Sequence, residues 1–83
     1  MRHFAFASGA HGIRVNAVAP GLVAKDSEDA LKANQRQERA LSMQALKRLA
    51  QPDDIGDVVA FLASGDARWI TGDIIRVDGG SNV

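Results

Sequence analysis

Hydrophobic residues mark two separate elements at the start of the chain. Residues 2–9 are rich in Phe and Ala and run into Gly9, a pattern typical of a helix end that glycine closes. Ile13–Val18 is β-branched and largely apolar, and Pro20 and Gly21 stop it. This second pattern predicts a strand, buried on both faces towards its end, where alternation gives way to a small apolar run.

The clearest helical pattern lies between residues 52 and 64. Pro52 stands at the first helical position, acidic residues occupy the first turn, and Ser64-Gly65 follows the last apolar position. Apolar residues recur at helical spacing between these limits, namely at Ile55, Val58, Val59 and Leu62. The sequence therefore predicts an amphipathic helix over Pro52–Ser64.

A second strand completes the order strand, helix, strand. Asp73–Asp78 carries the β-branched residues of a short strand, and Gly79-Gly80 terminates it. Asp78-Gly79-Gly80 is interpreted as a turn of the chain rather than as a phosphate or metal loop. Such a unit closes as a right-handed crossover with parallel strands, which predicts the α/β class.

The segment between the first strand and the helix is polar. Residues 26–49 favour a helix, with an N-cap at Asp26 or Ser27. The stretch 34–39 offers no apolar face, so the pattern leaves open two short helices or one solvated helix. The apolar anchors expected for it are Leu31, Leu41, Ala45 and Leu49.

Composition indicates a single domain with a thin core. The chain has 83 residues, 46% of them hydrophobic, and no Cys that could form a disulfide. A chain of this size buries only about 60% of its unfolded surface. His3 and His11 lack the spacing that would place both on one helix face, so no metal site is expected.

Charge and hydropathy exclude two classes of partner. Ten basic and ten acidic residues give a formal net charge of zero, which argues against nucleic acid. No segment approaches the ~20 apolar residues that span a bilayer, and the N-terminal residues have no apolar stretch of signal-peptide length. The expectation that follows is a cytoplasmic protein with neither a nucleic-acid nor a membrane partner.

Four segments occur in the order and spacing of a known family. They are His11–Gly21, Arg48–Ile55, Val59–Ser64 and Ile70–Gly80. Together they resemble the C-terminal third of a short-chain dehydrogenase/reductase, and the resemblance covers residues 2–80. It implies the C-terminal part of a Rossmann-type parallel sheet that binds NAD or NADP, with residues 1–83 as a single partial domain.

The resemblance also assigns a role to each element. Ile13–Val18 would be the penultimate strand of the family sheet, Pro52–Ser64 the next helix, and Asp73–Asp78 the last, edge strand. Residues 25–49 would form the variable lid over an alcohol or carbonyl substrate. Residues 2–9 would be the tail of the helix that begins at the family's catalytic Tyr and Lys.

Pro20, Gly21, Leu22 and Val23 are the candidate cofactor-binding residues. At the carboxyl end of a parallel strand, Pro fixes φ and Gly allows close backbone approach, so that backbone groups can face a ligand. The same dipeptide can also simply end a strand. By resemblance the turn holds the nicotinamide end of the cofactor, with Val23 binding the carboxamide, but Lys25 stands where the family usually has a Thr whose hydroxyl contacts the cofactor.

No catalytic residue can be assigned. The chain has no Tyr, and its eight Gly residues never form the glycine-rich phosphate loop. Ser8, Lys25 and Lys47 cannot substitute, because none has the Tyr-x-x-x-Lys context that shifts the pKa. We therefore expect no hydride transfer by this chain alone.

Two hypotheses remain open. The chain is a piece of an NAD(P)-dependent oxidoreductase, either truncated or started late in a longer reading frame, or it is a non-catalytic module. A module of this kind would pair through its open sheet edge with a full-length relative. The family's last helix and strand form subunit contacts, so Trp69, Phe61 and Ile75 are expected in buried or interfacial packing, and an oligomer is expected.

Overall fold

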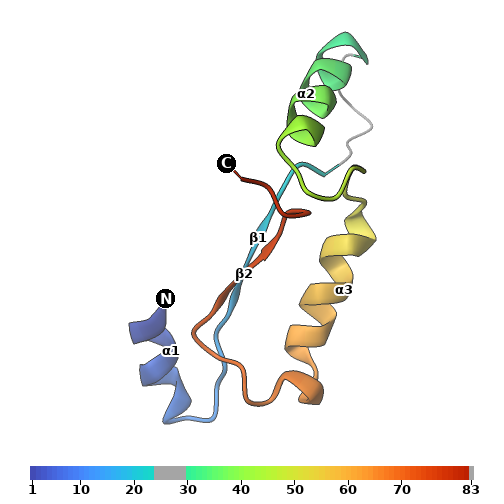
Figure 1. Ribbon diagram of the computed structural model, residues 1–83. Coiled ribbons are helices and arrows are strands. Elements are labelled where there is room, and N and C mark those ends of the chain that lie inside the picture. The colour runs from blue at the N-terminus through green and yellow to red at the C-terminus, as the bar shows by residue number, and fades with distance from the viewer. Residues whose placement is uncertain (24–29, 83) are drawn as a thin grey trace.

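The computed structural model describes residues 1–23 and 30–82, so the expected N-cap at Asp26 or Ser27 and the position of Lys25 lie outside the described residues. Figure 1 shows an elongated chain in which the helices flank and extend a narrow sheet. The elements are α1 (Arg2–Gly9), β1 (Ala17–Pro20), α2 (Ala30–Ser42), α3 (Pro52–Ala63), a short 3-10 helix η1 (Gly65–Ala67) and β2 (Ile74–Val77).

β1 and β2 pair in parallel, which confirms the predicted α/β class. The register runs from Ala17 opposite Ile74 to Pro20 opposite Val77. α3 connects the strands and lies along the sheet, while α1 stands on the other side (Figure 1). The crossover order strand, helix, strand is therefore the one that the sequence predicts.

β1 begins later than predicted and includes the proline. The residues before it are joined to the segment before β2 by one backbone hydrogen bond, Gly72 N–H to Val15 O at 2.7 Å, and by side-chain bonds. Thr71 Oγ1 accepts from the Val15 N–H at 3.0 Å, and Asn16 Nδ2 donates to Ile70 O at 3.0 Å. Pro20 fits the last strand position because the odd-numbered amides of β1 face β2. Ala17 N–H donates to Asp73 O and Gly21 N–H to Val77 O, so the missing N–H of Pro20 falls on the outer edge.

α3 matches its prediction and begins with a side-chain cap. The Asp54 carboxylate accepts the Gln51 N–H at 2.8 Å, which satisfies a backbone donor just before the helix. Pro52 occupies the first helical position, where a missing N–H costs nothing. The helix ends at Ala63, and Ser64 Oγ donates to Phe61 O at 2.7 Å.

The C-terminal end of α3 is joined to the start of β1 by one arginine. Arg14 donates from Nη1 to Leu62 O at 2.7 Å and from Nη2 to Ser64 O at 3.2 Å. A guanidinium satisfies carbonyls that a helix end leaves unpaired, and its positive charge suits the negative end of the helix dipole. Arg14 therefore fixes the far end of the crossover.

Within the described residues 30–49, the polar segment forms one exposed helix, α2, which agrees with one of the two alternatives left open above. α2 ends at Ser42, so Ala45 and Leu49 do not anchor it as expected. Its last turn is closed by polar side chains: Ser42 Oγ donates to Arg39 O at 2.7 Å, and Lys47 Nζ donates to Leu41 O at 2.8 Å. α2 makes no extensive contact with any other described helix or strand, and it extends beyond the sheet (Figure 1).

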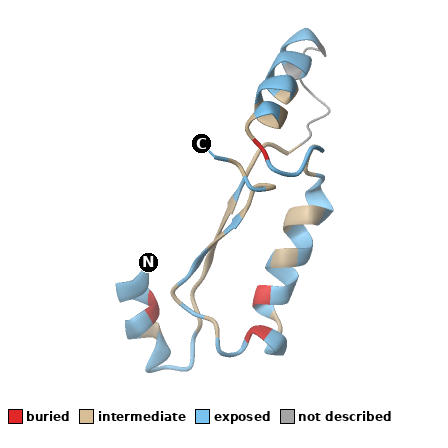
Figure 2. Ribbon diagram, viewed as in Figure 1, coloured by how far each residue is buried: buried red, intermediate tan, exposed pale blue. Residues whose placement is uncertain are grey.

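The buried core is very small. Among the described residues, the buried apolar side chains are Ala5, Leu62 and Ala67 (Figure 2). Trp69 is 96% exposed and Phe61 is 46% exposed, so neither is buried within this chain, and the interfacial alternative stays a prediction. Ile75 is half-buried. The apolar surface of the chain is covered only in part by the chain itself.

Replacing Arg14 tests whether its hydrogen bonds hold the end of α3 to the start of β1. Arg14→Ala should lower the free energy of unfolding by about 1–3 kcal/mol, because it leaves carbonyls at the end of α3 without their charged donor. Arg14→Lys should recover less than half of the lost stability, because a single ammonium group cannot donate to both carbonyls as the two guanidinium nitrogens do. Urea unfolding followed by circular dichroism measures both, and Arg2→Ala, which removes an exposed guanidinium from α1, is the control. Equal stability of Arg14→Ala and Arg2→Ala would contradict the assignment.

Candidate functional site

The predicted cofactor-binding turn lies at the carboxyl ends of both strands. Pro20 ends β1, and Gly21, Leu22 and Val23 continue from it, all three half-buried. Asp78 and the glycine after it leave β2 beside this turn. In open α/β sheets, ligands bind in the crevice at this end of the strands. The structure thus gathers the four predicted residues at a position suited to a ligand.

Gly21 permits a close contact between the two strand ends. Its N–H donates to Val77 O at 3.2 Å, which extends the parallel pairing by one residue. A Cβ added at this position would lie 3.1 Å from both Cα and Cβ of Asp78. A side chain here would therefore require Asp78 to shift by a few tenths of an ångström, and the turn is held close to the end of β2.

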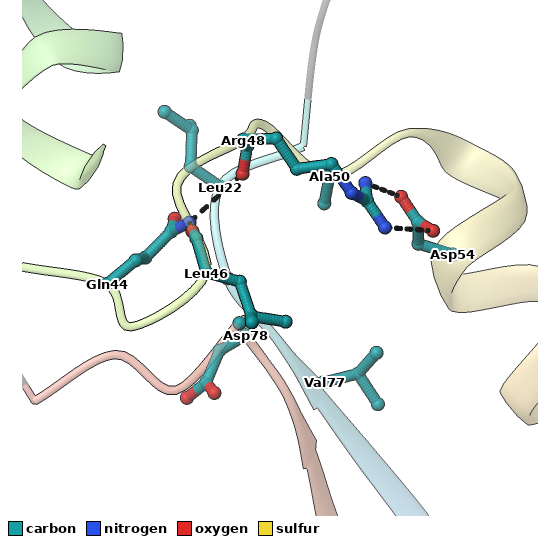
Figure 3. A pocket seen from close by; sticks show the side chains of 10 residues that line it. Leu22, Gln44, Leu46, Arg48, Ala50, Asp54, Val77 and Asp78 are labelled. Atoms are coloured by element: carbon teal, nitrogen blue, oxygen red, sulfur yellow. Dashed lines mark hydrogen bonds and ion pairs between the residues drawn. The ribbon is translucent and has the colours of Figure 1, made fainter.

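A pocket of about 190 Å³ opens beside this turn (Figure 3). One wall is formed by the ends of β1 and β2. The other is formed by the end of the predicted lid, which follows α2, and by the first turn of α3. The lining residues are Gly21, Leu22, Val77, Asp78 and Gly79 on the first wall, and Gln44, Leu46, Arg48, Ala50 and Asp54 on the second. A parallel bridge between Val23 and Ala50 joins the two walls.

Gln44 shapes the second wall. It is only 8% exposed, and its Nε2 donates to Leu46 O at 2.9 Å and to Arg48 O at 3.1 Å. These bonds curl the chain so that Leu46 and Arg48 face the pocket (Figure 3). Sequence analysis missed Gln44, because its partners are backbone carbonyls and no periodicity marks them.

The C-terminal residues 79–82 hold the same wall in place through backbone hydrogen bonds. Leu46 N–H donates to Gly79 O at 2.9 Å, Ala45 N–H donates to Gly80 O at 3.2 Å, and Asn82 N–H donates to Met43 O at 3.0 Å. Gly80 has φ +76°, and an added Cβ would lie 2.8 Å from the Cβ of Ala45. The glycines after β2 therefore turn the chain, as predicted, and also dock it against the wall of the pocket.

An ion pair links the second wall to the start of α3. Arg48 holds Asp54 with two hydrogen bonds, Nη1 to Oδ2 at 2.7 Å and Nη2 to Oδ1 at 2.9 Å (Figure 3). The Arg48 hydrogen bonds, together with the Gln51 N–H, lower the pKa of Asp54 from 3.8 to about 2. Asp54 is therefore charged at neutral pH and serves as a cap and a tether.

The other carboxylate of the pocket is also paired. Burial raises the pKa of Asp78, but hydrogen bonds from Arg76 and from the Gly80 N–H outweigh this effect, and the pKa is lowered. Arg76 Nε lies 2.9 Å from Asp78 Oδ2, and the Gly80 N–H lies 3.1 Å from Oδ1. Neither pocket carboxylate carries a proton at neutral pH, so this arrangement suits binding rather than acid catalysis.

The described residues contain no group of three or more His, Cys, Asp and Glu side chains placed to hold a metal ion. His3 and His11 lie in α1 and in the turn after it, both exposed. Over the same residues, no helix is both long enough and apolar enough to cross a bilayer.

Comparison with known proteins identifies relatives over almost the whole chain. A family model described as enoyl-(acyl carrier protein) reductase matches residues 1–82. L-rhamnose 1-dehydrogenase (NAD(P)(+)) from Azotobacter vinelandii is 44% identical over 81 residues, which cover 96% of this chain and 32% of that protein. The chain therefore spans about a third of the length of this curated relative.

Solved structures show the same relationship in three dimensions. The hydroxysteroid dehydrogenase from Escherichia coli matches with a TM-score of 0.89 and 35% identity over 99% of this chain and 34% of that one. The angucycline C-6 ketoreductase LanV with bound NADP matches with a TM-score of 0.82 and 40% identity over 95% of this chain and 30% of that one.

Two glycine substitutions test the tight contact at the turn. Gly21→Ala should destabilise the chain by about 1–3 kcal/mol, because the added Cβ meets Asp78 at 3.1 Å. Gly56→Ala is the matched control: nothing lies within 4 Å of its added Cβ, so it should stabilise α3 by about 0.5–1 kcal/mol. Both values come from urea unfolding, and a neutral Gly21→Ala would show that the strand ends are not in contact.

The Arg48–Asp54 pair predicts a dependence of stability on acid pH. The folded-state pKa of Asp54 is about 2, below the unfolded value near 3.8, so its contribution is present above about pH 4 and is lost as pH falls towards about 2. Asp54→Asn should remove this component. Asp53→Asn, which leaves the pair intact on the same helical turn, should retain it. Carboxyl NMR titration and unfolding at several pH values measure the effect, and an Asp54 that titrates near its usual value would rule it out.

Proposed function

The chain belongs to the short-chain dehydrogenase/reductase family, and we propose that it supplies the nicotinamide end of the cofactor site, together with part of the substrate lid, to an NAD(P)-dependent oxidoreductase. The observation that carries the proposal is the position of Pro20–Val23 at the carboxyl ends of the parallel strands, held against Asp78 by Gly21. The reaction class is hydride transfer between the nicotinamide and an alcohol or a carbonyl compound.

The residues of the turn fit one end of such a cofactor. The carboxamide of nicotinamide is neutral and polar, so backbone groups of the kind that Leu22 and Val23 carry can bind it without a charged side chain. The pyrophosphate and adenosine ends need a glycine-rich loop at a helix N-terminus, which the sequence does not contain. This chain would thus hold the nicotinamide end and leave the rest of the cofactor to other residues.

A bound nicotinamide would supply the hydride acceptor or donor. Leu22 and Val23 would hold its ring from the turn, and the Gln44–Arg48 segment lies over the turn on the lid side. Val23 is tied to that segment by its bridge to Ala50, so the turn is joined directly to the wall of the pocket. The proton on the substrate oxygen must be handled elsewhere, because the chain contains no Tyr and both pocket carboxylates are paired and charged.

The relatives support the reaction class and differ in substrate. One acts as an L-rhamnose dehydrogenase with NAD(P)+, one as a ketoreductase that binds NADP, and one as a hydroxysteroid dehydrogenase. All three names describe oxidation of an alcohol or reduction of a ketone. The proposal therefore extends to alcohol and carbonyl substrates as a class.

A ligand series tests the proposed half-site. Nicotinamide mononucleotide and NADH should shift the backbone amide NMR signals of Gly21, Leu22 and Val23 with similar, weak affinities of about 1 mM or weaker, because the part of NADH that differs has no site here. AMP, which carries the other half of the cofactor, should leave these signals unchanged. No NADH oxidation should occur with the chain alone.

Two glycine variants distinguish binding at the turn from an effect of any glycine substitution on the chain. Gly21→Ala should abolish the nicotinamide-dependent shifts, and Gly56→Ala should retain them, since only the former disturbs the turn. Shifts of equal size with AMP, or shifts confined to residues away from 20–23, would overturn the proposed half-site.

A further inference from the structure

Asp78 is the only aspartate in the sequence that a glycine follows. The Asp78-Gly79-Gly80 sequence turns the chain after β2, and the proposed hydride chemistry leaves the Asp78 carboxyl group without a role. An aspartyl-glycyl bond is reactive, because Gly79 has no side chain to keep the preceding carboxyl group away from its backbone nitrogen. Asp73, by contrast, precedes Ile74, whose branched side chain hinders the same approach.

The carboxyl group of such an aspartate can react with the next residue of its own main chain. The Gly79 nitrogen forms a bond to Asp78 Cγ and gives up its proton, and the carboxyl OH leaves with that proton as water, which closes a succinimide ring. Water then opens the ring at either carbonyl. One opening restores aspartate, and the other leaves an isoaspartate, whose main chain runs through the side-chain carbon and is longer by a methylene. The only co-reactant is water, and no group is oxidised or reduced.

In the folded chain, hydrogen bonds hold both oxygens of the Asp78 carboxylate. Arg76 Nε lies 2.9 Å and Arg76 Nη2 lies 2.8 Å from Oδ2. On the other side, the N–H groups of Gly80 and Ser81 lie 3.1 Å and 3.4 Å from Oδ1. Ring closure requires one of these oxygens to leave as water, whereas these donors, the guanidinium above all, favour the ionised carboxylate, from which water cannot leave. The native contacts therefore oppose the reaction.

The turn at Asp78 also places the C-terminal residues 79–82 against the wall of the pocket. Gly79 O accepts the Leu46 N–H at 2.9 Å, and Gly80 O accepts the Ala45 N–H at 3.2 Å. The fit is close, since an added Cβ at Gly80 would lie 2.8 Å from the Cβ of Ala45. A methylene inserted into the main chain just before Gly79 would displace both carbonyls from their donors. Isomerisation and docking of residues 79–82 therefore exclude each other.

We propose that Asp78-Gly79 is a site of spontaneous isomerisation, which the contacts of Asp78 with Arg76, Gly80 and Ser81 suppress while residues 79–82 are docked. The reaction proceeds when these residues detach, and the isoaspartate that forms prevents them from docking again. A transient opening of the pocket wall is thereby made permanent. The site needs neither cofactor nor substrate, so it is independent of the proposed half-site.

Ageing of the full 83-residue chain tests the site. Samples are kept at neutral pH in buffer and in urea at a concentration that unfolds the chain by circular dichroism, and peptide mapping with fragmentation that distinguishes isoaspartate from aspartate follows the reaction. Isoaspartate at residue 78 should form about tenfold or more faster in urea, because the folded chain reacts only from its opened fraction. Asp66, which Ala67 follows, is the internal control and should form little isoaspartate under either condition.

Replacing Arg76 tests the suppressing contact. Arg76→Gln removes the charged donor and should raise the rate at residue 78 in buffer by roughly two- to fivefold, the range expected for an ion pair with a largely exposed arginine. In urea, the variant and the parent should react at the same rate, because the unfolded chain lacks the contact. Arg68→Gln, which removes an exposed guanidinium outside this turn, is the matched control and should leave the rate unchanged. If Arg76→Gln does not fold, the comparison of buffer with urea for the parent still decides the proposal.

Hydrogen exchange tests the consequence for the pocket wall. In the separated isoaspartate form, the Leu46 amide should exchange about tenfold or more faster than in the unmodified chain, because its acceptor, Gly79 O, is displaced. The Ala17 amide, which donates to Asp73 O at the other end of the sheet, should keep its rate. Three results would each overturn the proposal: equal rates of isomerisation in buffer and urea, a folded Arg76→Gln chain that reacts no faster than the parent, or unchanged exchange at Leu46 in the isoaspartate form.

Discussion

The structure depends most on the contact between the Arg14 guanidinium and the carbonyls at the end of α3. This contact joins the chain just before β1 to the far end of the crossover helix, nearly fifty residues later in sequence. Asn16 adds a second tie, with its amide donating to Ile70 O and accepting the Asp73 N–H. Together with the backbone bond from Gly72 N–H to Val15 O, they fix where β2 begins relative to β1.

The geometry of the site follows from that register. With Ala17 opposite Ile74, Gly21 arrives opposite Asp78, and only a residue without a Cβ fits there easily. The chain after Asp78 then turns through Gly79 and Gly80 and pairs with residues 45–46. A contact at one end of the sheet thus positions the turn, the tail and the pocket wall at the other end.

The carboxylates of the described pocket are paired, an arrangement that suits binding rather than proton transfer. Arg48 and Arg76 hold the pocket carboxylates as ions, and because both arginine side chains are largely exposed, these ion pairs add little stability. The buried apolar side chains of the described residues are few and mostly small.

The sequence by itself determined the elements whose causes are local. Pro52 and the acidic residues after it specified the start of α3, β-branched runs located both strands to within a few residues, and Pro20-Gly21 marked the turn where the candidate site lies. These signals act through backbone preferences of neighbouring residues, which the order of amino acids states directly.

Only the tertiary structure decided the features that depend on distant partners. β1 starts at Ala17 because Thr71 and Ile70 engage the residues before it, and Gln44 shapes the pocket through carbonyls that any sequence would provide. Trp69 was expected in buried or interfacial packing, and within the described chain it is almost fully exposed, so only the interfacial alternative stays a prediction. Contacts between residues far apart in the chain leave no periodic signal, so their effect appears only when the chain is folded.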